Sequence, residues 1–120
     1  MHEDKDFKLY TKILQYDKYI RKYVVVNIPK VHRDLRIRLL DESYNLIRYL
    51  YEAEYTKGNI RLKNITEMLV TLSLLDFLTT EILEVSKNNN KYIEKSINLL
   101  TEIKNMTYSW RKNPEPNEKN

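Results

Sequence analysis

The stretch NIPKVHRDLRIRLL, residues 27–40, marks a turn and the beginning of a long helix. Pro29 suits the first turn of a helix, where its missing N–H would have no intrahelical acceptor, and the leucines that follow recur at helical spacing. Helix N-termini hold a partial positive charge and usually attract Asp or Glu. This helix instead begins with one acid, Asp34, among four bases: Lys30, Arg33, Arg36 and Arg38. The stretch therefore predicts an anionic partner at this end of the helix.

Four segments with helical periodicity account for most of the 120 residues. Glycine occurs once and proline three times, which leaves few positions for the turns of a sheet. Because long helices joined by short turns must run antiparallel, we expect an all-α fold, an up-down-up-down four-helix bundle. The third helix should stop at NNN, and Gly58 of KGN should end the second. The expected helices span about 6–25, 30–57, 60–87 and 91–111, in one domain of residues 1–112, and a polar tail, 113–120, is expected to be disordered.

The composition is consistent with a cytoplasmic protein. It has no cysteine, so disulfides and thiolate metal sites are excluded. The N-terminal sequence MHEDKDFK is charged and does not resemble a signal peptide. The most apolar stretch, MLVTLSLLDFL, contains Asp76 and is much shorter than the ~20 residues needed to cross a bilayer. We therefore expect a cytoplasmic protein without membrane contact.

No residue pattern in the chain indicates catalysis. A di-iron site in a four-helix bundle needs Glu-x-x-His pairs, and neither histidine, His2 or His32, follows a glutamate by three positions. With one glycine the chain has no glycine-rich phosphate loop, and His32 has only Asp34 near it as an orienting carboxylate, which is more suited to capping a helix. We expect no enzymatic activity, no catalytic residue, no metal and no cofactor.

The net charge of +4 is unevenly distributed. Residues 18–38 contain seven bases and one acid, and residues 57–63 contain three bases and no acid, so the remainder of the chain is acidic. Concentrated positive segments are typical of proteins with a polyanionic or acidic partner. A solvated helix face is the alternative explanation for a run of charge, and the charge run alone does not separate the two.

The second and third helices are more apolar than a monomeric bundle requires. On a wheel of about 100° per residue, the second helix has two neighbouring apolar stripes, and the third is apolar in nearly every direction. A helix that is apolar on all sides must also be buried on all sides, whereas a four-helix bundle buries only one side of each helix. We therefore predict a homo-oligomer, with an interface formed by Leu40, Tyr44, Ile47, Tyr51, Tyr55, Leu74 and Phe77.

The basic residues near the first turn are the candidate nucleic-acid contacts. Lys30, Arg33 and Arg36 share an arc of one helix face, where free backbone N–H groups also favour phosphate. Tyr16, Tyr19 and Tyr23 lie among bases and suit base stacking, but ten tyrosines in a chain rich in Lys, Asn and Ile also fit an AT-rich genome. The predicted contacts are Lys30, Arg33, Arg36 and Arg38, supported by Arg21, Lys22, Arg61 and Lys63.

The segment NIPKVHRDLRIRLLDESYNLIRYLYEAEYTKGN, residues 27–59, resembles a known pattern. In that pattern a Pro-Lys pair and a nearby arginine, here Arg33, lead into a long helix that ends in Glu-Ala-x-Tyr. A leucine-rich third helix and a last helix closing on Trp110 and Arg111 follow here as well. Over residues of about 7 to 112 the chain is similar to the accessory variability determinant (Avd) family of diversity-generating retroelements. It also resembles, less closely, four-helix proteins encoded in intervening sequences of bacterial large-subunit ribosomal RNA genes.

The resemblance to Avd proteins implies a barrel-like homopentamer of four-helix bundles with a basic surface. Such an assembly binds the reverse transcriptase and the nucleic acid of its element and supports error-prone copying of template RNA at adenines, while it is not itself the enzyme. The chain departs from the Avd pattern in two places. Its second helix lacks an early glycine, and TYSW stands before Arg111 where glycines often precede the tryptophan.

Two functional hypotheses follow. The first is a non-catalytic accessory protein that binds reverse transcriptase and template RNA or cDNA during mutagenic retrohoming. The second is a module of the ribosomal RNA intervening-sequence type, in which the same bases meet an acidic protein and nucleic acid is not bound. Retention of RNA in moderate salt separates the two hypotheses.

Overall fold

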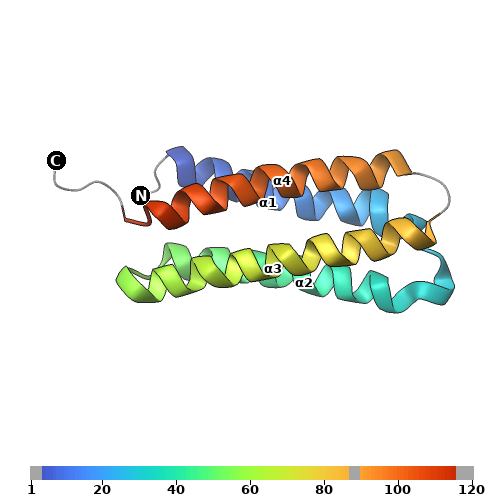
Figure 1. Ribbon diagram of the computed structural model, residues 1–120, viewed down its shortest axis with the longest axis horizontal. Coiled ribbons are helices and arrows are strands. Elements are labelled where there is room, and N and C mark those ends of the chain that lie inside the picture. Colours follow the sequence, from blue (N-terminus) through green and yellow to red (C-terminus); the bar gives the residue numbers. More distant parts are fainter. Residues whose placement is uncertain (1–3, 87–89, 116–120) are drawn as a thin grey trace.

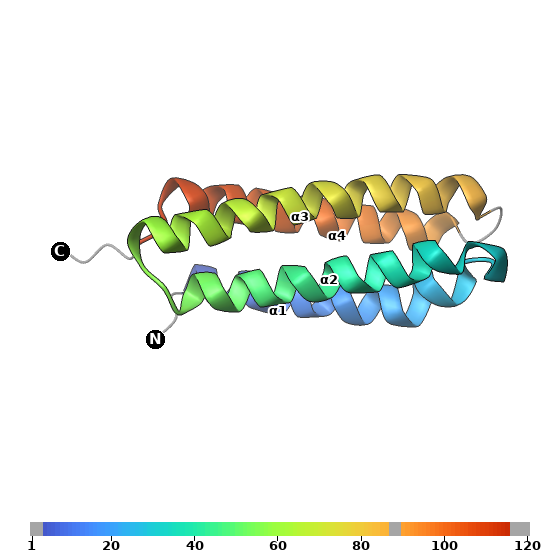
Figure 2. The same cartoon turned by 90° about the horizontal axis from the view of Figure 1, so that it is seen from below.

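The computed structural model describes residues 4–86 and 90–115, and no strand occurs among them. The α-helices are α1 (Asp4–Tyr19), α2 (Arg33–Glu54), α3 (Gly58–Val85) and α4 (Asn90–Lys112). Successive helices run in opposite directions (Figure 1). In the two views α2 lies beside both α1 and α3, and α4 lies beside both α3 and α1 (Figure 2). The predicted four-helix bundle is therefore confirmed at the level of one chain.

The first helix departs from the predicted span of 6–25. The regular α1 ends at Tyr19 and continues as a π-helical turn, η1 (Ile20–Val24), and a 3-10 turn, η2 (Val25–Asn27). A second 3-10 turn, η3 (Lys30–His32), precedes α2, so the regular helix starts later than predicted. Tight and wide turns of this kind change which side chains face inward, because they alter the number of residues per turn.

The prediction that Gly58 ends the second helix is wrong. The helix α2 ends at Glu54, and Gly58 is the first residue of α3 with a φ of 61°, in the left-handed region that favours glycine. The Thr56 hydroxyl donates to Glu52 O at 2.7 Å and so takes one of the last carbonyls of α2. Residue 87 of the predicted third helix and residues 116–120 of the predicted tail lie outside the described residues.

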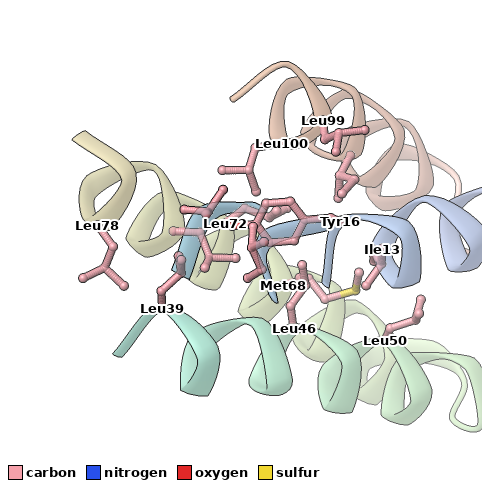
Figure 3. Packing of buried hydrophobic residues seen from close by; sticks show 14 of the residues in the cluster. Ile13, Tyr16, Leu39, Leu46, Leu50, Met68, Leu72, Leu78, Leu99 and Leu100 are labelled. Carbon is pink, nitrogen blue, oxygen red and sulfur yellow. The ribbon is translucent and has the colours of Figure 1, made fainter. Parts of the chain in front are cut away.

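Each helix turns one stripe of side chains inward. Buried positions on α1 and α2 recur at alternating steps of three and four residues, which is the seam spacing of helices packed nearly parallel. Figure 3 shows Ile13 and Tyr16 of α1 directed toward the same interior as Leu46 of α2, Met68 of α3 and Leu100 of α4. The seam residues are Leu9, Ile13 and Tyr16 on α1, Ile20 at the start of η1, and Leu39, Ser43, Leu46, Leu50 and Ala53 on α2.

Polar pairs beside this seam join neighbouring helices. Ser43 of α2 donates to Asp17 Oδ1 of α1 at 2.7 Å. Lys104 of α4 forms a hydrogen-bonded ion pair with Asp76 of α3. Both contacts are part-buried and join fixed positions of neighbouring helices, so they help to set the register of the helices. In the described part of the chain, every helix is too short or too polar to cross a bilayer.

Tyr16 holds a phenol in the middle of the apolar core. Its side chain is fully buried, and its hydroxyl has no hydrogen-bond partner in the described residues. The nearby Thr79 hydroxyl donates instead to Leu75 O of its own helix at 2.6 Å. Burial raises the pKa of Tyr16 far above its ordinary value, with Asp76 and Asp17 adding to the effect. The ring is therefore a core side chain, and base stacking, which the sequence left open as an alternative for Tyr16, does not apply to this residue.

Replacing Tyr16 by phenylalanine should leave the bundle as stable as before or raise its free energy of unfolding by about 1 kcal/mol, because a buried hydroxyl without a partner is removed. Tyr16→Ala should lower it by about 3 to 5 kcal/mol through the cavity it leaves. Urea unfolding followed by circular dichroism measures both. A loss of 1 kcal/mol or more in Tyr16→Phe would show that the hydroxyl is satisfied in solution.

The α2–α3 connection and residues 110–115 together form what we call the closed end. The Arg61 guanidinium donates to Ala53 O (2.8 Å), Glu54 O (3.1 Å) and Pro114 O (2.8 Å), and it lies over the Trp110 ring at 5.9 Å. The Gly58 N–H donates to Glu115 Oε2 at 2.7 Å. Arg61 thus caps the C-terminus of α2 and holds residues 113–115, the first part of the predicted disordered tail, against α3.

Arg61→Met should lower the free energy of unfolding by about 2 to 3 kcal/mol, because three carbonyl groups lose their donor in a poorly solvated place. Lys63→Met is the matched control, since Lys63 is exposed two residues further along α3 and its loss should cost less than about 0.5 kcal/mol. Thermal unfolding of the two variants in parallel tests the difference, and equal melting temperatures would contradict the capping role.

Candidate nucleic-acid interface

The end of the bundle opposite the closed end carries most of the predicted basic residues. We call it the basic end, and it consists of residues 20–37 together with the end of α3 and the start of α4. Figure 1 shows the α1–α2 connection and the last turn of α3 at the same, right-hand end of the molecule. The second view shows the start of α4 at this end as well (Figure 2). Bases far apart in the sequence are therefore collected at one end.

The local chain explains how α2 begins with bases. Ile28 is buried and extended, with φ −81° and ψ 126°. Pro29 follows in an extended conformation, and the His32 N–H donates to Pro29 O at 2.8 Å, which closes the turn η3. No side chain caps either η3 or α2 by a hydrogen bond. The first N–H groups of α2 therefore lack a side-chain acceptor, and Asp34 is the acid present in the first turn.

Lys30, Arg33, Arg36 and Ile37 line a cavity of about 340 Å³. Lys30 and Arg33 are exposed, while Arg36 is half-buried and donates through Nη2 to Ile28 O at 3.0 Å. The Nε of Arg36 is buried and has no acceptor in the described part of the chain. Among residues 4–86 and 90–115, no carboxylate forms an ion pair with any of the three bases. The cavity thus gathers three positive charges that could attract a small anion.

The other bases predicted near the first turn lie outside this cavity. Arg38 is exposed, but it follows Arg36 by two residues and so points about 200° away from it around the helix. Arg21 is exposed on η1, and its Nε pairs with Asp17 Oδ2 at 2.9 Å. Lys22 is exposed at the same end. The structure therefore brings together Lys30, Arg33 and Arg36, with Arg21 and Lys22 on the neighbouring turn.

Arg61 and Lys63 do not belong to the basic end. Both are on the first turns of α3, at the closed end of the bundle. The Arg61 side chain is 11% exposed, and its donors are used by carbonyl groups of α2 and of residue 114. The structure therefore assigns Arg61 a capping role in place of the predicted partner contact. Lys63 is exposed but separated from the basic end by the length of the bundle.

The residues predicted for an oligomer interface occupy two different helix faces. Tyr44 and Tyr51 recur seven residues apart on α2, on the side that faces α1, and the Tyr51 hydroxyl lies 2.8 Å from that of Tyr10. On α3, Leu74 and Phe77 are 44% and 59% exposed, and with Val70 at 50% they form one outward strip. The remaining predicted residues differ in burial: Tyr55 is exposed, whereas Leu40 and Ile47 are partly buried against the core.

A group of aromatic rings at the basic end was predicted only in part, because the sequence singled out Tyr19 and Tyr23 but not Tyr92. Tyr23 stacks on Tyr92 of α4 with ring centroids 5.1 Å apart and an interplanar angle of 10°. The Tyr19 ring also contacts the Tyr23 ring, and their centroids are 4.9 Å apart. The charge pattern of residues 91–95, KYIEK, was the available signal, but periodicity alone could not place it beside η1.

Described residues contain no group of three or more His, Cys, Asp or Glu side chains suited to a metal ion.

Comparison with known proteins adds no further information about the site. Searches found no protein-family model, no curated protein and no solved structure that matches this chain. The interpretation of the basic end therefore depends on its own geometry and on the resemblance described from the sequence.

Proposed function

We propose that this chain is the non-catalytic accessory protein of a diversity-generating retroelement, acting in the cytoplasm as a basic homo-oligomer that binds reverse transcriptase and template RNA or cDNA. The resemblance of residues 7–112 to Avd proteins supplies the biological context. The single observation that supports nucleic-acid binding is the cavity at the basic end, where Lys30, Arg33 and Arg36 meet without a pairing carboxylate.

Phosphate chemistry suits this cavity. A phosphate oxygen accepts charge-assisted hydrogen bonds from guanidinium and ammonium groups, and the positive end of a helix dipole favours the same anion. A base at a helix N-terminus costs a few tenths of a kcal/mol or more in the free chain. When a phosphate binds there, it attracts both the base and the positive end of the helix dipole, so this free-energy cost becomes a gain. Contacts to the backbone phosphates carry no sequence information, so we expect binding that depends steeply on salt and weakly on sequence.

Assembly would strengthen such binding. The exposed strip of Val70, Leu74 and Phe77 on α3 offers each copy an apolar face of the kind that oligomers bury. Several copies would present several basic ends to one polyanion, and linked contacts raise the overall affinity well beyond that of one site. The Avd resemblance gives the count of five subunits, and the reverse transcriptase would be bound by the same assembly.

The double variant Lys30→Glu/Arg33→Glu should weaken RNA binding at least tenfold and reduce the magnitude of the salt slope by about 2, because two phosphate contacts are removed. Arg36 is left in place because it also holds Ile28 O. Lys63→Glu, at the closed end, is the control and should bind RNA nearly as wild type. Fluorescence anisotropy over a series of salt concentrations gives both quantities.

The same titration separates the two hypotheses. If the wild-type protein does not retain RNA in moderate salt, the nucleic-acid proposal fails. The module that meets an acidic protein through these bases, as in the intervening-sequence relatives, is then favoured. If Lys63→Glu loses as much affinity as the double variant, the location of the contact at the basic end is wrong.

The mass of the particle tests the assembly. Multi-angle light scattering at micromolar concentration should give a multiple of the 14.6 kDa chain mass, and Leu74→Lys/Phe77→Lys should reduce it to a single chain because charged residues cannot be buried unpaired at the interface. Tyr108→Lys replaces a tyrosine that is 53% exposed on α4 and should leave the mass unchanged. A wild-type mass of 14.6 kDa would contradict the oligomer.

A further inference from the structure

Three tyrosines at the basic end form a row of contacting rings, in which Tyr23 and Tyr92 are stacked and Tyr19 is tilted by 42° against Tyr23. Tyr19 and Tyr23 come from the end of α1 and from η1, and Tyr92 comes from the first turn of α4. The ring centroids are 4.9 and 5.1 Å apart along the row, and the Tyr23 and Tyr92 planes are within 10° of parallel. All three side chains are half-buried, so part of each ring stays open to solvent. We call these residues the tyrosine ladder.

Each ring of the tyrosine ladder has a lysine ammonium near its face. Lys22 lies 5.4 Å from the centroid of Tyr23, Lys91 lies 5.2 Å from that of Tyr92, and Lys95 lies 5.6 Å from that of Tyr19. The three lysines are exposed, and none of them forms an ion pair within the described residues. Exposed cation–π contacts are worth only ~0.5 to 1 kcal/mol. The ammonium groups are therefore free to leave the rings when a stronger partner arrives.

The π-helical turn places Tyr23 outside the core. Buried side chains on α1 follow steps of four, three and four residues as far as Ile20, and a regular helix would next bury position 23. Because η1 holds an additional residue in its turn, Val24 is buried instead, at 2% exposure, and Tyr23 turns toward Tyr92. Wide turns of this kind occur mostly as single turns and often at functional sites.

A groove of about 460 Å³ between α1 and α4 continues from the tyrosine ladder. Lys91 and Lys95 belong to both, and Lys12 lies further along the groove, where its Nζ is 2.9 Å from Glu102 Oε1. Glu94 also lines the groove, so its three lysines exceed its two glutamates by one charge. A chain of phosphates could follow this groove while adjoining bases lie at the rings.

We propose that the tyrosine ladder stacks the unpaired bases of single-stranded RNA or DNA, while Lys91 and Lys95 leave the rings to contact the flanking phosphates. Every base presents a π-face to an aromatic ring, and groove-bound single strands are held by this combination of stacking and positive charge. Bases inside a duplex are already stacked on each other and cannot enter the ladder. An acidic peptide would pair with the lysines but would leave the ring faces unused.

This inference rests on the proposed nucleic-acid function and adds the strand form that the protein selects. The test compares three labelled probes of about 20 nucleotides: a single-stranded RNA, a phosphodiester chain of abasic sites of equal length, and a duplex. Wild-type protein should bind the single strand at least tenfold more tightly than the abasic chain. Tyr92→Leu should lose about tenfold or more on the single strand and little on the other two probes.

Two variants make the readout specific to stacking. Tyr92→Phe keeps the ring and should bind the single strand as wild type does. Tyr108→Leu changes an exposed tyrosine of the same helix near the closed end and should have no effect. If Tyr92→Leu does not fold, Lys91→Gln/Lys95→Gln serves instead. This variant should weaken binding of both the single strand and the abasic chain and lower the salt slope by about 2.

Equal affinity of the wild type for single strand and abasic chain would overturn the inference, as would an unchanged affinity of Tyr92→Leu for the single strand. If Lys30→Glu/Arg33→Glu still loses binding in the same experiment, the proposed function survives that failure. If the wild type binds none of the three probes, the proposed function and this inference fail together.

Discussion

The structure depends on the requirement that each helix turn a single stripe inward at steps of three and four residues. Seam residues such as Leu46 and Leu72 fill the interior, and the helices then have no freedom in how they present their other faces. The bases that begin α2 are consequently held at one end of the bundle, and Val70, Leu74 and Phe77 remain outside. The basic end and the apolar strip, which support the proposed function, are thus formed by side chains that do not pack into the core.

The two ends of the bundle satisfy their backbone groups in opposite ways. At the closed end, one arginine takes two carbonyls of α2 and one of residue 114, and Glu115 accepts from the first N–H of α3. At the basic end, η3 and α2 begin without any side-chain cap, and cations lie where carboxylates would be favourable. The difference shows why Arg61 has a structural role at the closed end, whereas Lys30 and Arg33 form no ion pair within the described residues at the basic end.

The sequence was sufficient for the number and order of helices, because periodicity and turn residues are local signals. It also placed Lys30, Arg33 and Arg36 on one face, since helical spacing alone determines that arc. It missed the role of Arg61, whose acceptors lie on another helix and beyond the end of α4. It singled out Tyr19 and Tyr23 but missed their contact with Tyr92, for two reasons. A π-helical turn shifts the register by one residue, and Tyr92 approaches Tyr23 only through tertiary packing.

The position of Trp110 has a practical consequence for spectroscopy. It is the only tryptophan in the chain, it is 2% exposed, and its Nε1 donates to Pro114 O at 3.3 Å in the closed end. Its fluorescence emission should change when the closed end opens or the whole chain unfolds, but it should not change when a ligand binds at the basic end. Tyrosine emission, in contrast, originates partly from the rings beside η1, so an event confined to the basic end should change tyrosine emission while the tryptophan signal stays constant.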